Sequence, residues 1–226
     1  MIIIGVYTTD SVYRGAYNLL AKSLDRVGLK YDYKAVPPND WKAVNDAKPQ
    51  NILNSLEKHK SPVLYLDADA FVHENIEPFF DNIGCDMAVN FIPCKDGSEH
   101  VLAGTIYFSY NEKVKLFIKY WMQLLIDNPH LHDQENLQKA IDEVGDKLDI
   151  YRLSSAYTYI FDRQYDDVEK PIIEHLQASR EIYCRNEMGG FKNKLKKFLG
   201  LKVSKEELLK RRHVRLAELE KIIAEQ

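Results

Sequence analysis

The first 66 residues alternate between strand-like and helix-like patterns, and this alternation restricts the chain to few folds. Residues 2–7, IIIGVY, have the composition of a short buried strand, and residues 30–36 alternate before two prolines. Apolar residues recur at helical spacing from about Tyr13 to Val27 and from about Pro49 to His59, and a third strand, PVLYL, follows at residues 62–66. This β-α-β-α-β order predicts a parallel sheet covered by helices.

The remaining two thirds of the chain continue the mixed pattern. Strands are expected at residues 85–91, 103–110, 147–154 and 171–176, and amphipathic helices at 112–129 and 133–144. The tail from Phe191 is expected to form two basic helices interrupted at Gly200. We therefore divide the chain into an α/β domain, residues 1–190, and a basic amphipathic helical tail, residues 191–226.

Composition places the chain among ordinary globular proteins. Of its 226 residues, 45% are hydrophobic and 29% are charged, and the sequence contains no apolar run of about 18 residues that would span a membrane. The N-terminal residues are those of a strand and not of a signal peptide. The three cysteines show no metal-binding spacing, which favours reduced thiols and a cytoplasmic location.

Charge is distributed unevenly along the chain. Residues 191–226 hold eleven Lys and Arg against five Glu, a net charge of +6, which leaves −9 on residues 1–190 of a chain with net charge −3. An acidic body argues against nucleic-acid binding. The tail can pack on the body, on a second copy in a homodimer, or peripherally on an anionic membrane through residues 194–199. We favour packing on protein, because residues 208–223 carry an apolar stripe.

The third strand ends in two acids, Asp67 and Asp69. Ligands of open α/β sheets bind beyond the carboxyl ends of the strands, and residues i and i+2 of a strand share a face. Two converging carboxylates repel each other unless a cation neutralises them, and carboxylate oxygens suit Mg²⁺ or Mn²⁺. The pair therefore predicts a site for a metal ion and a diphosphate, with a solvated turn as the alternative.

The order of several segments resembles the GT-A glycosyltransferases, and more closely the small nucleotide-diphospho-sugar transferases related to glycogenin-type enzymes. The segments, over residues 2–180, are GVYTTDSVY, the Lys48–Pro49 pair, LYLDADAFV, AGTIYFS, HDQENLQ and IIEHLQASR. The resemblance implies a mixed, mostly parallel sheet flanked by helices. It also implies a metal-dependent glycosyltransferase that moves a sugar from a nucleotide-diphosphate donor, with a UDP-sugar favoured, to a sugar, lipid or protein hydroxyl.

The resemblance also implies roles for individual residues around the donor. Tyr13 would stack on the base, and Thr8 and Thr9 would form hydrogen bonds to the nucleotide. Helix capping by Asp10 or Ser11 is the alternative for this loop. His175 would be the third metal ligand, although a lone His in an apolar strand is more often a core residue. The other implied donor-binding residues are Lys48, Asp67, Gly104, Thr105 and Arg180. The alternatives are a solvated side chain for Lys48 and a plain bulge in the strand for Gly104.

The remaining implied site is the start of the helix at residues 133–144. The resemblance places Asp133 and Gln134 beside the acceptor and the anomeric carbon. Asp133 would either take the proton of the acceptor hydroxyl or orient the sugar, and a helix N-cap is the structural alternative.

Two other functions fit part of the pattern. Phosphatases of the haloacid-dehalogenase type also place a D-x-D pair after an apolar strand, but their motif usually lies near the N-terminus and continues with Thr or Val where this chain has Phe71. A GT-A-like module that binds a nucleotide-sugar without turnover is the second. The chain has no G-x-G-x-x-G or Walker-type loop, which argues against dinucleotide and P-loop sites.

Overall fold

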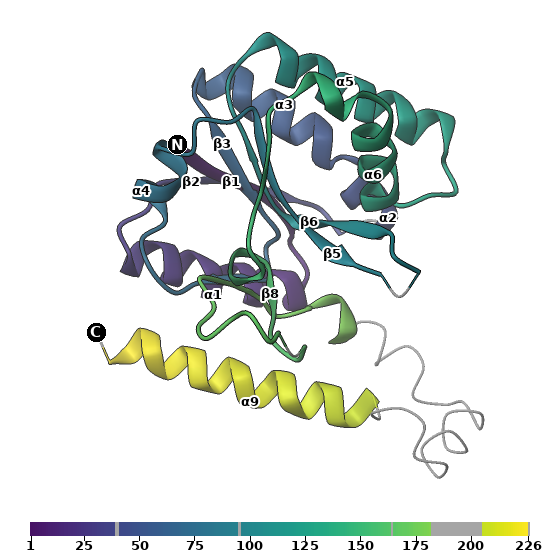
Figure 1. The fold of residues 1–226 in the computed structure, drawn as a ribbon. Helices are drawn as coiled ribbons and strands as arrows, with labels where there is room; N and C mark the ends of the chain where they lie inside the picture. Colours follow the sequence, from purple (N-terminus) through teal and green to yellow (C-terminus); the bar gives the residue numbers. More distant parts are fainter. Residues whose placement is uncertain (39–40, 95, 164, 182–204, 226) are drawn as a thin grey trace, which may run out of the picture.

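A six-stranded sheet forms the centre of the molecule (Figure 1). The computed structural model describes residues 1–38, 41–94, 96–163, 165–181 and 205–225. The strands of the central sheet, in spatial order, are β2 (Tyr31–Val36), β1 (Ile2–Thr8), β3 (Val63–Leu66), β6 (Glu99–Phe108), β5 (Met87–Pro93) and β7 (Ile150–Arg152).

The sheet is mixed in direction. β1 pairs in parallel with β2 and with β3, as the sequence predicts for the first half of the chain. β6 runs antiparallel to both of its neighbours, β3 and β5, and β7 returns parallel to β5. The expectation of an α/β fold with a mixed, mostly parallel sheet is confirmed.

Helices cover both faces of this sheet (Figure 1). On one face lie α3 (Lys48–His59), α5 (Glu112–Asp127) and α6 (Asp133–Val144), and on the other lie α1 (Ser11–Arg26) and, packed against α1, α9 (Lys205–Ala224). The shorter helices are α2 (Trp41–Asp46), α4 (Glu77–Asp81), η1 (Gly145–Lys147) and η2 (Ser155–Tyr157).

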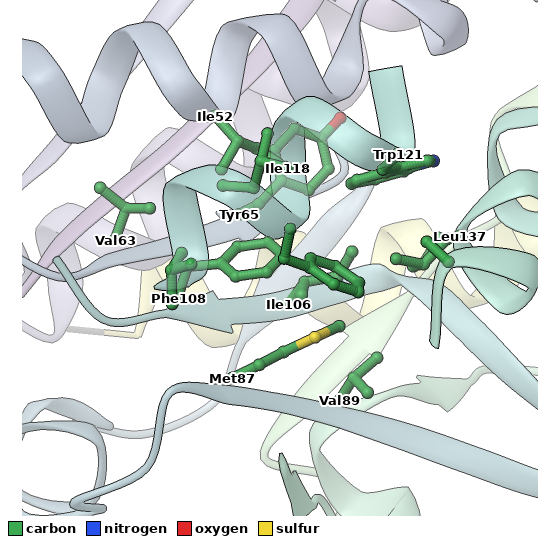
Figure 2. Packing of buried hydrophobic residues seen from close by; sticks show 14 of the residues in the cluster. Ile52, Val63, Tyr65, Met87, Val89, Ile106, Phe108, Ile118, Trp121 and Leu137 are labelled. Carbon is green, nitrogen blue, oxygen red and sulfur yellow. The ribbon is translucent and has the colours of Figure 1, made fainter. Parts of the chain in front are cut away.

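The larger core cluster fills the space between the sheet and α3, α5 and α6 (Figure 2). Trp121 of α5 is fully buried there, among side chains that include Tyr65 of β3 and Leu137 of α6. Its indole Nε1–H donates to the backbone carbonyl of Asp133, 3.0 Å away. This hydrogen bond ties the first residue of α6 to the core, so the start of that helix has a defined place relative to the sheet.

A second, three-stranded sheet follows the end of β3. Its order is β4 (Ala70–Val72), β9 (Ile173–His175) and β8 (Tyr159–Ile160). β4 and β9 are antiparallel, with Ala70 opposite His175. This sheet brings the late strand of the sequence next to the pair of acids after β3.

The helix boundaries agree closely with the sequence patterns. α1 begins at Ser11, two residues before the expected start, because the side chain of Asp10 accepts hydrogen bonds from the N–H groups of Val12 and Tyr13. Gly28, at φ +71°, follows the helix as expected of a terminator.

The basic tail is described in its second half only. α9 matches the second of the two expected tail helices. The first helix, the break at Gly200 and the boundary at residue 190 lie outside the described residues. No helix in the described part of the chain is both long and apolar enough to cross a membrane.

Candidate active site

A cleft of about 720 Å³ opens at the carboxyl ends of β1 and β3. It collects side chains from α1, α3, α6 and the segment after β9, which lie far apart in the sequence. Its lining residues are Val6, Tyr7, Thr8, Asp10, Tyr13, Val44, Asn45, Lys48, Tyr65, Asp67, Ala68, Asp69, Ala103, Gly104, His132, Asp133, Gln134, Glu135, Gln177 and Ser179.

Asp67 and Asp69 lie in the turn between β3 and β4. The expectation that they share one face of a strand is wrong in this detail, because β3 ends at Leu66. The N–H of Asp67 donates to the carbonyl of Gly104 at 2.9 Å, and the carbonyl of Asp67 accepts from the N–H of Ala70 at 3.0 Å. The turn, rather than strand alternation, therefore brings the two carboxylates to the cleft.

His175 completes a cluster with these two acids. One ligand atom from each of Asp67, Asp69 and His175 lies within 4.8 Å of the others. The imidazole Nε2 is 2.8 Å from the hydroxyl oxygen of Thr105, which is fully buried. The other ring nitrogen, Nδ1, lies 3.9 Å from a carboxylate oxygen of Asp69, so it is directed toward the two acids.

Gly104 leaves room for this cluster. A Cβ atom at this position would lie 2.8 Å from Cε1 of His175 and 3.2 Å from Oδ2 of Asp67. Any larger residue would thus push into the space that the two side chains face. Two carboxylates and one imidazole are also a donor set that divalent cations accept, so these residues fit an Mn²⁺ or Mg²⁺ ion.

The two carboxylates differ in how easily they ionise. Burial raises the pKa of Asp67, and the charge of Asp69 adds to this increase while Lys48 opposes it. Burial alone would also raise the pKa of Asp69, but the imidazole of His175 and the N–H of Ala178, 2.7 Å from Oδ2, lower it below its usual value. A cation at this place would relieve the repulsion that resists ionisation of Asp67.

Lys48 lies between two acids of the cleft, Asp67 and Asp133. Its ammonium is 2.9 Å from Oδ2 of Asp133 and 3.3 Å from Oδ1 of Asp67, and it donates to the carbonyl of Ala103 at 3.1 Å. Burial alone would lower the pKa of Lys48, but the charges of Asp133 and Asp67 raise it, so the side chain stays a cation. The solvated lysine that the sequence left open is excluded, because Lys48 is only 2% exposed.

Asp133 and Gln134 open α6 at the cleft wall. His132 occupies the N-cap position and Asp133 is the first helical residue, so Asp133 is not the N-cap that the sequence left open. The side-chain oxygen of Gln134 accepts from the N–H of Ala103 at 3.2 Å. Lys48 links the carboxylate of Asp133 to that of Asp67, and Gln134 is fixed beside Gly104, so the start of α6 lies close to the turn that holds Asp67.

The expected nucleotide loop reaches the cleft in part. Thr8 and Tyr13 line it, and the hydroxyl of Thr8 donates to Asp10, which also caps α1. Thr9 is not among the lining residues. Asp10 was noted in the sequence only as a cap, although an acid at the start of a strand–helix loop also points to a binding role.

Two other expected donor-binding residues lie behind the cleft surface. Thr105 makes its side-chain contact to His175, not to the cleft. Arg180 forms an ion pair with Asp162, and its guanidinium lies over the ring of Phe161. Neither residue is among those lining the cleft.

Sequence reasoning missed several lining residues. Gln177 and Ser179 follow His175 by two and four residues, and Gln177 has the left-handed backbone angle φ +52°. Their closeness in sequence to His175 was the available signal. Tyr65 was counted only as part of an apolar strand, yet burial and the charge of Asp67 raise its pKa well above the usual value.

Comparison with solved structures adds the fold family. A glycosyltransferase involved in the glycosylation of the major capsid of PBCV-1 superposes with a TM-score of 0.61 at 15% identity, over 83% of this chain and 98% of that one. The chain has the fold of the GT-A glycosyltransferases. The galactosyltransferase LgtC, solved in complex with donor and acceptor sugar analogs, gives a TM-score of 0.51 at 13% identity. This match covers 77% of this chain and 86% of the LgtC chain.

A third glycosyltransferase structure, GlyE of Streptococcus pneumoniae TIGR4, gives a TM-score of 0.52 at 14% identity. The match covers 77% of this chain and 54% of GlyE. No protein-family model matches the sequence, and no curated protein matches it. At these identities the comparisons establish the GT-A fold, and the evidence for the chemistry is the arrangement of side chains in the cleft.

Proposed function

We propose that this protein is a metal-dependent glycosyltransferase that moves a sugar from a nucleotide-diphosphate donor to an acceptor hydroxyl. The observation that carries the proposal is the cluster of Asp67, Asp69 and His175 within 4.8 Å, in a cleft that Lys48 and Asp133 also line. The GT-A fold supports the same function, because ligands of open α/β sheets bind at this end of the strands.

Asp67, Asp69 and His175 would hold Mn²⁺ or Mg²⁺. A bound cation supplies Lewis-acid stabilisation of the charge that develops on the leaving diphosphate. The described cleft lining contains three carboxylates close to this point, those of Asp67, Asp69 and Asp133, and a single lysine, Lys48. Lys48 already contacts two of the three, so diphosphate binding depends on additional positive charge.

The acceptor side of the cleft is formed by the start of α6. Asp133 is held by Lys48 and presents its carboxylate at the wall, where it either orients a sugar hydroxyl or accepts the proton of the acceptor. Gln134 is fixed by Ala103 and offers its side-chain N–H groups to a substrate. These are the residues we assign to the transfer step.

The other wall would bind the nucleoside. Tyr13 offers an aromatic ring for stacking, and Thr8 lies beside it in the same loop. We favour a UDP-sugar because of the resemblance, and the carboxylate of Asp10 at the cleft would accept from the ring N–H of uracil. Thr9 and Arg180 remain proposals from the resemblance and lack a direct contact to the cleft.

The test is a panel of nucleotide-sugars incubated with the protein and Mn²⁺. Thermal shift identifies the donors that bind, and release of nucleoside diphosphate identifies those that are turned over. Release of UDP from one UDP-sugar, absent in EDTA and in Asp69→Asn, is the expected result. Stabilisation by a nucleotide-sugar without release of diphosphate under any acceptor condition would instead favour a non-catalytic binding module.

The phosphatase alternative is distinguished by its product. An enzyme of that type would form an aspartyl-phosphate on Asp67 and release inorganic phosphate from simple monoesters. The GT-A fold disfavours it. Robust phosphate release from a generic monoester, abolished by Asp67→Asn, would overturn the transferase proposal.

A cytoplasmic protein, with peripheral membrane contact or dimer formation through the tail, remains our proposal for its setting. α9 offers little support for a membrane role, because its exposed side chains are of mixed charge. They include Lys210, Arg211, Lys221, Glu206, Glu218 and Glu220. Residues 194–199, on which the membrane proposal also rests, lie outside the described residues.

A further inference from the structure

α9 packs behind the two strands that flank the metal-ligand cluster. Leu219 of α9 is fully buried in a small apolar cluster with Leu19 of α1, Phe71 of β4 and Leu176, the residue after β9. Phe71 lies two residues after Asp69, and Leu176 directly follows His175. The helix therefore touches the segment of each of these two expected ligands.

Arg215 of α9 forms an ion pair with the buried carboxylate of Glu174 in β9. Its Nε and Nη2 atoms donate to the two oxygens of Glu174, each at 2.8 Å, and Glu174 is fully buried. His73 lies 2.8 Å from the same carboxylate. A two-point contact of this kind fixes direction as well as distance.

Arg212, one turn earlier on α9, contacts the chain on the C-terminal side of His175. Its Nε donates to the carbonyl of Leu176 at 2.8 Å, and Nη1 pairs with Glu181 at 2.7 Å. Arg212 itself is only 3% exposed. The residues before and after His175 are thus both bound by arginines of α9.

Strand geometry connects these contacts to the cleft. Neighbouring side chains of a strand point to opposite faces, so Glu174 faces α9 while His175 faces Asp69 and Gly104. The backbone is coupled as well, because the N–H of Leu176 donates to the carbonyl of Asp69 at 2.9 Å. A shift of β9 would therefore change the spacing between His175 and Asp69.

We propose that Arg212 and Arg215 are positioning residues for the metal site, and that α9 is a structural part of it. The inference rests on the proposed function only in taking Asp67, Asp69 and His175 as metal ligands. Arg215 binds Glu174 on the face of β9 opposite His175, and Arg212 binds the backbone directly after His175. Both hold His175 in place without contacting substrate or metal. Loss of either contact should weaken metal binding, because residues that orient ligands commonly contribute about 10–100-fold to affinity.

The experiment compares Arg215→Met and Arg212→Met with Arg211→Met in the full chain. Arg211 is on the same helix but is exposed and pairs with Glu207 at 3.2 Å, so it is a matched control. Mn²⁺ affinity, measured by calorimetry without nucleotide, should fall about tenfold or more in the first two variants and stay unchanged in the third. Arg215→Lys is a milder change that keeps the positive charge but loses the two-point contact. Its Mn²⁺ affinity should lie between that of Arg215→Met and that of the unmodified chain.

A second readout does not need the metal. The ring ¹⁵N signals of His175 in the metal-free protein should shift in Arg215→Met and Arg212→Met and remain in place in Arg211→Met. Leu124→Ala, which weakens the core under α5 far from β9, controls for a general loss of stability. It should lower the melting temperature and leave both the Mn²⁺ affinity and the His175 signals unchanged.

The outcomes separate the two proposals. Unchanged Mn²⁺ affinity and unchanged His175 signals in Arg215→Met and Arg212→Met would overturn the positioning role of α9. The same role would be overturned if Leu124→Ala reduced the affinity as much as the arginine variants. Absence of Mn²⁺ and Mg²⁺ binding by the unmodified chain would overturn the proposed function instead, and the His175 signals would still test how α9 holds β9.

Discussion

The two faces of β9 differ in how their charges are balanced. On the cleft side, Asp67, Asp69 and Asp133 gather around one lysine, Lys48, and around His175. On the side of α9, each acid has a cation of its own. Glu174 is bound by Arg215 and by His73, and Glu181 is bound by Arg212.

We infer that the paired charges on the α9 side stabilise the fold, whereas the carboxylates on the cleft side form a site for a cation. Buried ion pairs with complete hydrogen bonding hold elements in place, as on the α9 side. On the cleft side, burial and the neighbouring charge of Asp69 raise the pKa of Asp67, and a bound cation would lower it again. Removal of the Asp67 carboxylate and removal of the Glu174 carboxylate should therefore have opposite consequences for stability.

The largest expected effect is that of Asp69→Asn. Transferase activity should fall by more than about 100-fold, since even residues that only orient metal ligands contribute about 10–100-fold. Stability without metal is compared in Asp67→Asn and should not fall, because the raised pKa of Asp67 means that the fold opposes the charge that this change removes. Glu174→Gln on the α9 side is the contrast, and denaturant unfolding should show it to be the less stable variant.

Lys48→Met should have the next largest effect, this time on the fold itself. It leaves the buried carboxylate of Asp133 without its cation, and breaking such a pair costs about 3–5 kcal/mol. Lys115→Met is the matched control, because the partners of Lys115, Glu57 and Glu112, are largely exposed and such pairs contribute little to stability. Equal free energies of unfolding for the two variants in urea would show that the Lys48 pair is not buried as described.

Gly104→Ala should weaken metal binding by a smaller factor than the loss of activity expected for Asp69→Asn. The added methyl group would meet Cε1 of His175 at 2.8 Å, so the imidazole has to move, and about tenfold weaker Mn²⁺ affinity is expected. Gly15→Ala in α1, where a Cβ meets nothing within 4 Å, should leave the affinity unchanged and stabilise the chain by about 0.5–1 kcal/mol. Calorimetry with Mn²⁺ and a melting curve on both variants would separate the two effects.

The smallest effect is expected for the exposed charges of α9. Replacing Lys210, Arg211 and Lys221 by Gln should not change binding of the full chain to anionic vesicles at low salt, since acids on the same surface offset these cations. Co-sedimentation with vesicles is the measurement. Loss of vesicle binding in this triple variant would show that α9 faces a membrane as well as the protein.

Local patterns in the sequence predict most of the fold. The alternation of residues 2–66 identifies three parallel strands and their helices, and the expected bounds of α6 coincide with those observed. The D-x-D pair and His175 are brought together as the resemblance implies. The turn that carries the pair could not be distinguished from a strand end, because both place two acids after a buried apolar run.

The contacts that the sequence could not reveal are those between distant residues. Lys48 meets Asp133 across 85 positions, and Arg215 meets Glu174 across 41 positions, without any local pattern that links them. The sequence indicated only that the apolar stripe of residues 208–223 would pack on protein. For the same reason, Thr105 was assigned to the donor rather than to the imidazole of His175.

The most direct test of the central claim is the affinity of the unmodified chain for UDP with and without a divalent cation. If the unbalanced acids of the cleft hold a metal that bridges the diphosphate, calorimetry should show binding in Mn²⁺ and loss of that binding in EDTA. Asp69→Asn should bind UDP weakly in both conditions. Equal UDP affinity in Mn²⁺ and in EDTA would contradict the account, because the cleft would then accept a diphosphate beside Asp67 and Asp69 without the cation.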